Sequence, residues 1–218
     1  MIDVLQKDLL EKINKKKIVS IGDSHSLFFS NLNYIKINHI GPVTAYNLMK
    51  ENSTTRGREI FYDFLKTENS NDTALLLSFG EIDLRVHVVK ASLRDSISIK
   101  ESAINTAKRY TMFIDEILNL GWTILVQGPS ANGEERSLNL DYPYSGSIVE
   151  RNQATIIFNN ELENYCKQNS ILFASLYDLS IDQNTFVTKS EYLSDGCHLH
   201  KDPYLQSIMI SRYINFNN

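Results

Sequence analysis

Residues 18–26 read Ile-Val-Ser-Ile-Gly-Asp-Ser-His-Ser. The first four are mostly apolar and β-branched, which is typical of a short buried strand, and Gly22 marks the turn that ends it. A carboxylate, a serine and a histidine follow the glycine directly. Because ligands of open parallel sheets bind outside the carboxyl ends of the strands, this stretch indicates an α/β fold with Ser24 at its functional edge.

Four further apolar runs of strand length follow, at residues 34–40, 73–79, 122–126 and 171–176. Helices are predicted where apolar residues recur at helical spacing or where a segment connects two strands. These segments are residues 2–13, 44–50, 59–66, 103–117, 148–167 and 204–216. Strands that alternate with helices predict a parallel sheet covered on both faces, and strands that are apolar throughout agree with this. We expect about five parallel strands in a three-layer α/β/α sandwich, with residues 1–218 forming a single domain.

Composition narrows the range of functions. The chain has 218 residues, 22 Lys plus Arg and 26 Asp plus Glu, for a net charge of −4. A mildly acidic chain lacks the basic surface of a nucleic-acid-binding protein, so no nucleic-acid partner is expected. No apolar run is long enough for a membrane span, and the first residues lack the pattern of a secretory signal, which predicts a cytoplasmic protein. The two cysteines, Cys166 and Cys197, are expected to be free thiols of a reducing compartment.

Polar residues gather at the predicted carboxyl edge of the sheet. Residues 80–87 read Gly-Glu-Ile-Asp-Leu-Arg-Val-His after the third strand, and residues 194–200 read Ser-Asp-Gly-Cys-His-Leu-His before the last helix. A serine hydroxyl needs an adjacent base to act as a nucleophile, and His198 can accept the proton of Ser24. Asp195 can reach back three residues to orient the imidazole and stabilise its charged form. These three residues are the predicted catalytic groups.

The order of these motifs resembles the SGNH/GDSL hydrolase superfamily. Residues 22–24 resemble its first block, Gly41 its second, residues 80–83 its third, and residues 195–199 its fifth. The resemblance implies a flavodoxin-like sandwich and a serine esterase or acyltransferase. It implies action on small-molecule or carbohydrate acyl esters, often acetyl esters, without a cofactor or a metal. The oligomeric state has no sequence signal.

One position departs from the family pattern. Ile82 stands where the third block has an asparagine that donates to the oxyanion, and the loss of one such donor costs about 10²–10³ in rate. Arg85 and His87 are the predicted replacements, and an arginine would also suit an anionic substrate. Gly41 and Asp23 complete the predicted oxyanion and substrate-binding set. Asp23 is also expected to accept hydrogen bonds from loop amides.

Other interpretations stay open at this stage. Asp23, His25, His198 and His200 could serve as ligands in a two-metal phosphoesterase, although the chain has no Gly-Asn-His-Asp/Glu segment. Because of the isoleucine in the third block, a non-catalytic binding protein on the same fold is a second alternative. Two tyrosines of the 130–147 loop, Tyr142 and Tyr144, are candidates for a lid that stacks on a sugar.

Overall fold

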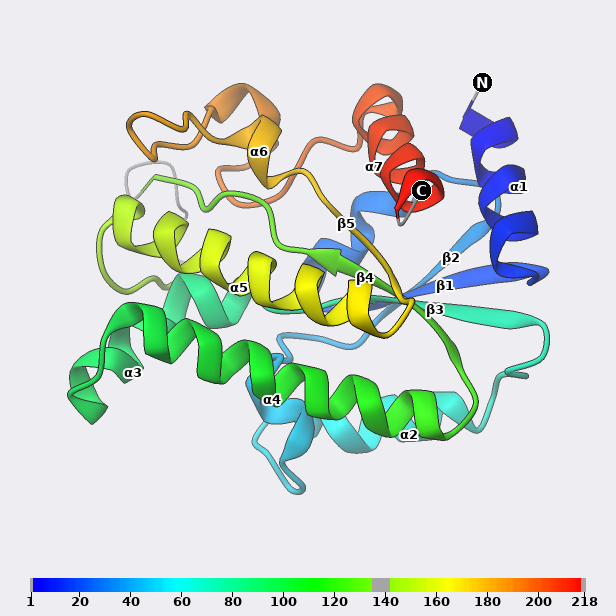
Figure 1. The fold of residues 1–218 in the computed structure, drawn as a ribbon, viewed down its shortest axis with the longest axis horizontal. Coiled ribbons are helices and arrows are strands. Elements are labelled where there is room, and N and C mark those ends of the chain that lie inside the picture. Colours follow the sequence, from blue (N-terminus) through cyan, green and yellow to red (C-terminus); the bar gives the residue numbers. More distant parts are fainter. Residues whose placement is uncertain (1, 135–141, 217–218) are drawn as a thin grey trace.

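The computed structural model describes residues 2–134 and 142–216. Its centre is one parallel sheet of five strands in the order β2-β1-β3-β4-β5 (Figure 1). The strands are β1 (Lys17–Gly22), β2 (Ile35–His39), β3 (Thr73–Ser78), β4 (Thr123–Gly128) and β5 (Leu172–Ser175). This is the flavodoxin-like order, in which the direction of winding changes between β1 and β3 and opens a crevice at the strand ends. All five strand predictions are confirmed, with small differences at their ends.

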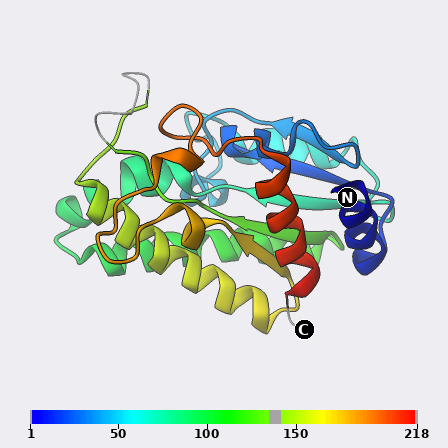
Figure 2. The same ribbon diagram turned by 90° about the horizontal axis from the view of Figure 1, so that it is seen from above.

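Helices cover both faces of the sheet. They are α1 (Ile2–Ile13), α2 (Gly57–Leu65), α3 (Val88–Asp95), α4 (Ile99–Asn119), α5 (Ile148–Gln168), α6 (Tyr177–Ser180) and α7 (Pro203–Asn215). On one face α1 and α7 lie side by side, whereas α2, α4 and α5 pack on the other (Figure 1 and Figure 2). The predicted three-layer α/β/α sandwich is therefore confirmed. No helix within the described ranges is both long and apolar enough to cross a membrane.

The central strand shows why the strands are apolar throughout. Every residue of β3 is buried, with Leu75 and Leu77 in the core beneath α4 and α5, and Ala74 and Leu76 in the core beneath α1 and α7. Successive side chains of a strand point to opposite faces, so a sheet covered on both faces must be apolar at each position. The two apolar layers fix the sheet as a rigid base for the loops at its carboxyl edge.

Two of the helical segments that differ from the sequence prediction follow β2 and β3. Residues 44–50 form only a short 3₁₀ helix, η2 (Tyr46–Met49), because Asp83 accepts the backbone N–H groups of Ala45 and Tyr46 and ties this segment to the end of β3. The chain after β3 also continues directly into a π-helical turn, η3 (Asp83–His87), and then into α3, which the sequence analysis did not predict. A π-helical turn inside a helix is often associated with a functional site.

Candidate active site

Ser24 begins a 3₁₀ helix, η1 (Ser24–Phe29), immediately after β1. The buried Asp23 caps this helix, because its Oδ1 accepts the N–H of His25 at 2.9 Å, as expected for a residue that binds loop amides. The Asp23 N–H donates to the carbonyl of Ser78 on β3 at 3.1 Å. The turn is thus fixed to the neighbouring strand, and Ser24 projects from a rigid support.

The segment before α7 folds back on itself. Asp195 Oδ1 accepts the N–H groups of Cys197 at 3.0 Å and His198 at 2.8 Å. Gly196 has a φ of 81°, a left-handed conformation that other residues rarely adopt, and it allows this tight turn. The second oxygen of the same carboxylate is thereby directed at the imidazole of His198.

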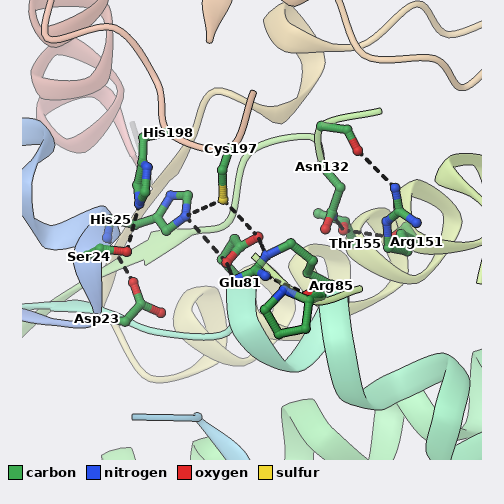
Figure 3. A network of polar contacts seen from close by, with 12 residues as sticks. Asp23, Ser24, His25, Glu81, Arg85, Asn132, Arg151, Thr155, Cys197 and His198 are labelled. Atoms are coloured by element: carbon green, nitrogen blue, oxygen red, sulfur yellow. Dashed lines mark hydrogen bonds and ion pairs between the residues drawn. The ribbon is translucent and has the colours of Figure 1, made fainter. Parts of the chain in front are cut away.

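The structure brings Ser24, His198 and Asp195 together in one hydrogen-bonded chain. His198 Nε2 lies 2.7 Å from Ser24 Oγ (Figure 3), and His198 Nδ1 lies 2.8 Å from Asp195 Oδ2. Both distances are those of good hydrogen bonds. Beside this chain lies a pocket of about 360 Å³, whose apolar and aromatic lining includes Leu27, Phe28, Tyr142 and Leu199.

The surroundings favour a neutral imidazole beside an ionised carboxylate. Burial and the nearby charge of His25 together lower the pKa of His198 below its usual value, despite the opposing effect of Asp195. Burial raises the pKa of Asp195, but hydrogen bonds from the N–H and ring of His198 and from the N–H of Cys197 outweigh it, so that pKa is lowered. At neutral pH, Nδ1–H then donates to Asp195 and Nε2 accepts from Ser24.

Two backbone amides at the same edge, those of Ser24 and Gly41, are candidates for an oxyanion site. Gly22 at the end of β1 pairs with His39 at the end of β2. Ser24 and Gly41 each follow this pair by two residues, so they leave the sheet side by side. Gly41 has a φ of 86°. In the described part of the chain, neither the Ser24 N–H nor the Gly41 N–H donates to a protein acceptor. Ile82 stands just before η3 and offers no donor atom from its side chain.

The predicted substitutes for the missing asparagine are engaged elsewhere. Arg85 forms a bidentate pair with Glu81, with Nε to Oε1 at 2.6 Å and Nη2 to Oε2 at 3.2 Å, and its Nη1 donates to the carbonyl of Pro143 at 2.6 Å. His87 is exposed and lines a different pocket, which Ser24 does not line. The structure therefore does not bring either side chain into contact with Ser24.

A buried polar cluster lies beside the Ser24–His198 pair. His25 Nε2 is 3.4 Å from Glu81 Oε2 and 3.8 Å from Cys197 Sγ, and Cys197 Sγ is 3.5 Å from Glu81 Oε1 (Figure 3). The ring centroids of His25 and His198 are 4.7 Å apart. From the sequence alone, His25 was a candidate only as a ligand of the alternative metal enzyme, and Cys197 was an ordinary free thiol. The sequence signal that could have placed both residues at the site is that His25 follows Ser24 directly and Cys197 directly precedes His198.

The cluster carries separated charges. Burial lowers the pKa of His25, but its contacts with Cys197 and Glu81 outweigh burial, and the pKa is well above the usual value. Burial raises the pKa of Glu81, yet His25 and Arg85 outweigh it and bring the pKa to about 2. A negative carboxylate therefore lies between two cationic side chains, a few ångströms from the imidazole of His198.

Tyr142 covers one side of the site. Its ring meets the His198 ring edge-on, with 5.6 Å between centroids, and the guanidinium of Arg85 lies 5.6 Å from its centre. Tyr144 instead lies beside Arg151, with 5.0 Å from the guanidinium to the ring centroid, and is exposed. Most of the segment between Gly133 and Tyr142 lies outside the described residues, so the predicted sugar-stacking lid stays a prediction.

The ligand set of the alternative metal enzyme is not assembled. Within the described ranges, the one group of three or more potential ligands is His25, Cys197 and His198. Asp23 points an oxygen at a backbone N–H, and His200 is exposed. A two-metal centre built from Asp23, His25, His198 and His200 is therefore not favoured by the geometry.

Comparison with solved structures matches this architecture to that of known ester hydrolases. A GDSL-like lipase from Bacteroides thetaiotaomicron aligns over 98% of this chain and 98% of its own, with a TM-score of 0.58 and 13% identity. A catalytic mutant of Axe2, an acetylxylan esterase from Geobacillus stearothermophilus, aligns over 93% and 95%, with a TM-score of 0.55 and 12% identity. The chain has the SGNH/GDSL hydrolase fold. The acetyl xylan esterase AlAXEase shares this SGNH/GDSL architecture over 90% of this chain and 96% of its own, with a TM-score of 0.51 and 14% identity.

Comparisons of sequence add no closer relationship. No family model matches the chain, and no curated protein matches it. The likeness to the SGNH/GDSL hydrolases therefore lies in the fold, at an identity low enough that the chemistry has to be argued from the residues of the site.

Proposed function

We propose that this SGNH-fold chain is a serine esterase, or an acyltransferase of the same chemistry, with Ser24 as nucleophile, His198 as base and Asp195 as the residue that orients the base. The observation that carries the proposal is the continuous chain from Ser24 Oγ through both ring nitrogens of His198 to Asp195, at 2.7 and 2.8 Å. A nucleophile and a base within hydrogen-bond reach, with a third group that orients the base, are the arrangement that covalent catalysis requires.

The reaction follows from this geometry. Ser24 Oγ attacks the ester carbonyl while His198 Nε2 accepts the hydroxyl proton, and the charged imidazole is stabilised by Asp195. The negative oxygen of the tetrahedral intermediate is bound by the free N–H groups of Ser24 and Gly41. His198 then donates its proton to the leaving alcohol, and an acyl-Ser24 ester remains. Water, or the hydroxyl of an acceptor, repeats the sequence and releases the acyl group.

The substrate is proposed to be an acyl ester, in particular an acetyl ester, of a small molecule or a carbohydrate. Two of the solved structures with this fold are acetylxylan esterases, which motivates the carbohydrate. The pocket beside Ser24 has a volume of about 360 Å³ and an aromatic wall in Tyr142, a size and lining that suit a small acyl group and a sugar ring. We further propose that residues 1–218 act as one catalytic domain in the cytoplasm and that the reaction needs no cofactor.

Turnover of p-nitrophenyl acetate and butyrate tests the proposal. We expect the wild type to hydrolyse at least the acetate, and Ser24→Ala and His198→Ala each to lose at least about 10³-fold in kcat. EDTA is expected not to lower the rate. Circular dichroism and thermal melting show that the variants remain folded. A wild-type protein that labels with a fluorophosphonate at Ser24 supports the same conclusion independently of the ester chosen.

The opposite results are equally informative. Variants as active as the wild type would remove Ser24 and His198 from the mechanism. Loss of activity in EDTA would favour a metal-dependent enzyme. A folded wild type that neither turns over esters nor reacts with the fluorophosphonate would favour the non-catalytic binding protein.

A further inference from the structure

Three metal-binding side chains meet at one point of the site. A ring nitrogen of His25, the Sγ of Cys197 and a ring nitrogen of His198 all lie within 4.8 Å of one another. They come from two neighbouring pairs in the sequence, Ser24–His25 and Cys197–His198. The proposed ester chemistry uses Ser24 and His198 and gives no task to His25 or Cys197.

The spacing fits one tetrahedral ion. With Zn–S of about 2.3 Å and Zn–N of about 2.0 Å, two ligands of the same tetrahedral zinc lie about 3.5 Å apart. Cys197 Sγ and His25 Nε2 are already 3.8 Å apart. His198 lies on a loop between Asp195 and α7, and its donor atom is within 4.8 Å of the other two, so a displacement of about 1 Å brings it close to the same spacing. A water molecule would occupy the fourth position.

The surroundings favour a thiophilic cation. Cys197 is 2% exposed and His25 is 8% exposed, so these two donors are largely shielded from water. Thiolate and imidazole ligands select zinc and similar ions over magnesium and calcium, which prefer oxygen. The carboxylate of Glu81 lies within 3.5 Å of both donor atoms and adds a negative charge next to the ion. Partners of this kind, outside the ligand set, tune metal affinity.

The ion can reach the site through the substrate pocket. His25 and His198 line the same pocket as Ser24, and that pocket opens to solvent. The side chain of His198 is 20% exposed, so it is accessible before the ion reaches the deeper ligands. An ion in this position occupies the space beside the nucleophile.

We propose that His25, Cys197 and His198 form a binding site for a thiophilic divalent cation, represented by Zn²⁺, and that the bound ion switches ester hydrolysis off. Zn²⁺ displaces the thiol proton of Cys197 and one ring proton of the charged His25, both of which leave to solvent, and Zn–S and Zn–N bonds form without any change of oxidation state. Whichever nitrogen of His198 binds the ion, the ring gives up one of its hydrogen bonds: Nε2 to Ser24, or Nδ1 to Asp195. Metal binding and acyl transfer therefore exclude each other.

The metal site rests on the positions of the donor atoms, whereas the inhibition rests also on the proposed esterase function. Binding and inhibition are therefore measured separately. If the wild type has no esterase activity, the proposed function fails, and the binding measurement still decides whether the metal site exists.

Cobalt titration of the apoprotein measures binding. Co²⁺ is expected to produce a thiolate-to-cobalt charge-transfer band in the near ultraviolet at one equivalent, and Zn²⁺ is expected to remove it. The band should disappear in Cys197→Ala and persist in Cys166→Ala. Cys166 is the matched control because it is buried in α5, in the core on the opposite face of the sheet. A wild type without the band, or a band that survives in Cys197→Ala, would overturn the site.

A second variant, His25→Asn, tests the ligand set if Cys197→Ala does not fold. His25→Asn keeps the thiol but removes one ligand, and it is expected to weaken Co²⁺ binding by more than about tenfold, since even the loss of an outer partner costs about 10–100-fold. Unchanged affinity in a folded His25→Asn protein contradicts the proposed ligand set.

Inhibition is measured on p-nitrophenyl acetate hydrolysis. Zn²⁺ is expected to inhibit the wild type and Cys166→Ala at the same concentration, and EDTA is expected to restore the full rate. The half-inhibitory concentration for Cys197→Ala, relative to its own metal-free rate, should rise by more than about tenfold. Equal inhibition of Cys197→Ala and wild type would show that zinc acts on His198 without the thiolate, and the proposal would be wrong.

Discussion

His198 Nε2 lies 2.7 Å from Ser24 Oγ, although the two residues are 174 positions apart in the chain. Each residue is fixed by its own backbone turn: Ser24 by the capped turn after β1, and His198 by the loop that Asp195 closes before α7. The contact therefore depends on the packing of α7 against the sheet as much as on the two turns. An active site of this kind is assembled only when the last helix is in place.

Replacement of Asp195 tests how the base is oriented. In Asp195→Asn, the amide can present an N–H to Nδ1 of His198 and favour the tautomer whose Nε2 carries a proton and cannot accept from Ser24. We expect kcat for p-nitrophenyl acetate to fall by about 10⁴ with a small change in KM. Melting temperature is the control for folding. A loss of less than about tenfold would show that Asp195 does not orient the base.

Arg85 is expected to contribute to stability, because it is the partner of a buried charge. The Arg85 side chain is 7% exposed and that of Glu81 is 4% exposed. In Arg85→Met, His25 would be the one cationic partner that Glu81 retains among the described residues. Removing one member of a buried pair costs about 3–5 kcal/mol, and His25 is expected to reduce this toward about 3 kcal/mol. Urea denaturation of wild type and Arg85→Met measures the difference.

An exposed arginine in a similar pair is the control for that experiment. Arg94 pairs with Asp95 at 2.6 Å, but its side chain is 72% exposed. Exposed pairs contribute little, so Arg94→Met should leave the free energy of unfolding nearly unchanged. If Arg85→Met is as stable as Arg94→Met, the buried pair has no structural importance, and Arg85 would be better explained by a role in substrate binding.

The sheet was predictable from local sequence because each strand is a continuous apolar run. The helix α3 was not predictable, since its buried face consists of Val88, Val89 and Ser92 and becomes recognisable only when α4 and α5 pack against it. The segment before η2 shows the same limit. Its backbone is held by Asp83, a residue 37 and 38 positions away, so local helical propensity does not decide its conformation.

The candidate site, like the fold, could be predicted from the sequence only in part. Ser24, His198 and Asp195 were predicted together because their motifs lie at strand ends or before the last helix, where the fold gathers functional groups. The contact of Arg85 with Pro143 was not predicted, because that carbonyl lies in a loop 58 residues away. Whether a side chain faces a ligand or a neighbouring residue depends on such long-range contacts.

Asp83 predicts a pH dependence of stability. Burial raises the pKa of Asp83 to about 7. Hydrogen bonds from the N–H groups of Tyr46 and Ala45 favour the charged form and oppose this rise, but burial outweighs them. A pKa raised by folding means that the folded chain holds this proton more tightly than the unfolded chain. The stabilisation is therefore complete below pH about 4, the unfolded value, and is lost as the pH rises through about 7.

Asp83→Asn isolates this contribution, because an amide resembles the protonated acid and does not titrate. We expect wild type to lose stability relative to Asp83→Asn between pH 5 and pH 8, by up to about 1.4 kcal/mol per pH unit. Urea denaturation of both proteins at each pH measures the difference. A constant gap over this range would mean that Asp83 titrates at the same pH in the folded and unfolded chains.

Gly22 is expected to be required for both folding and activity. A Cβ at this position would lie 1.9 Å from the carbonyl oxygen and 2.7 Å from the carbonyl carbon of Ser78, both backbone atoms of the paired strand β3. The same carbonyl accepts the N–H of Asp23, so relief of the clash would shift the turn that carries Ser24. We expect Gly22→Ala to destabilise the protein by about 1–3 kcal/mol, as in other overpacked cores, and to lower kcat by more than about tenfold.

Gly121→Ala is the control, because its Cβ would meet no atom within 4 Å and only its φ of 83° opposes the change. It should lose about 1 kcal/mol and keep its activity. Wild-type kinetics in Gly22→Ala would show that the site tolerates a displaced turn after β1.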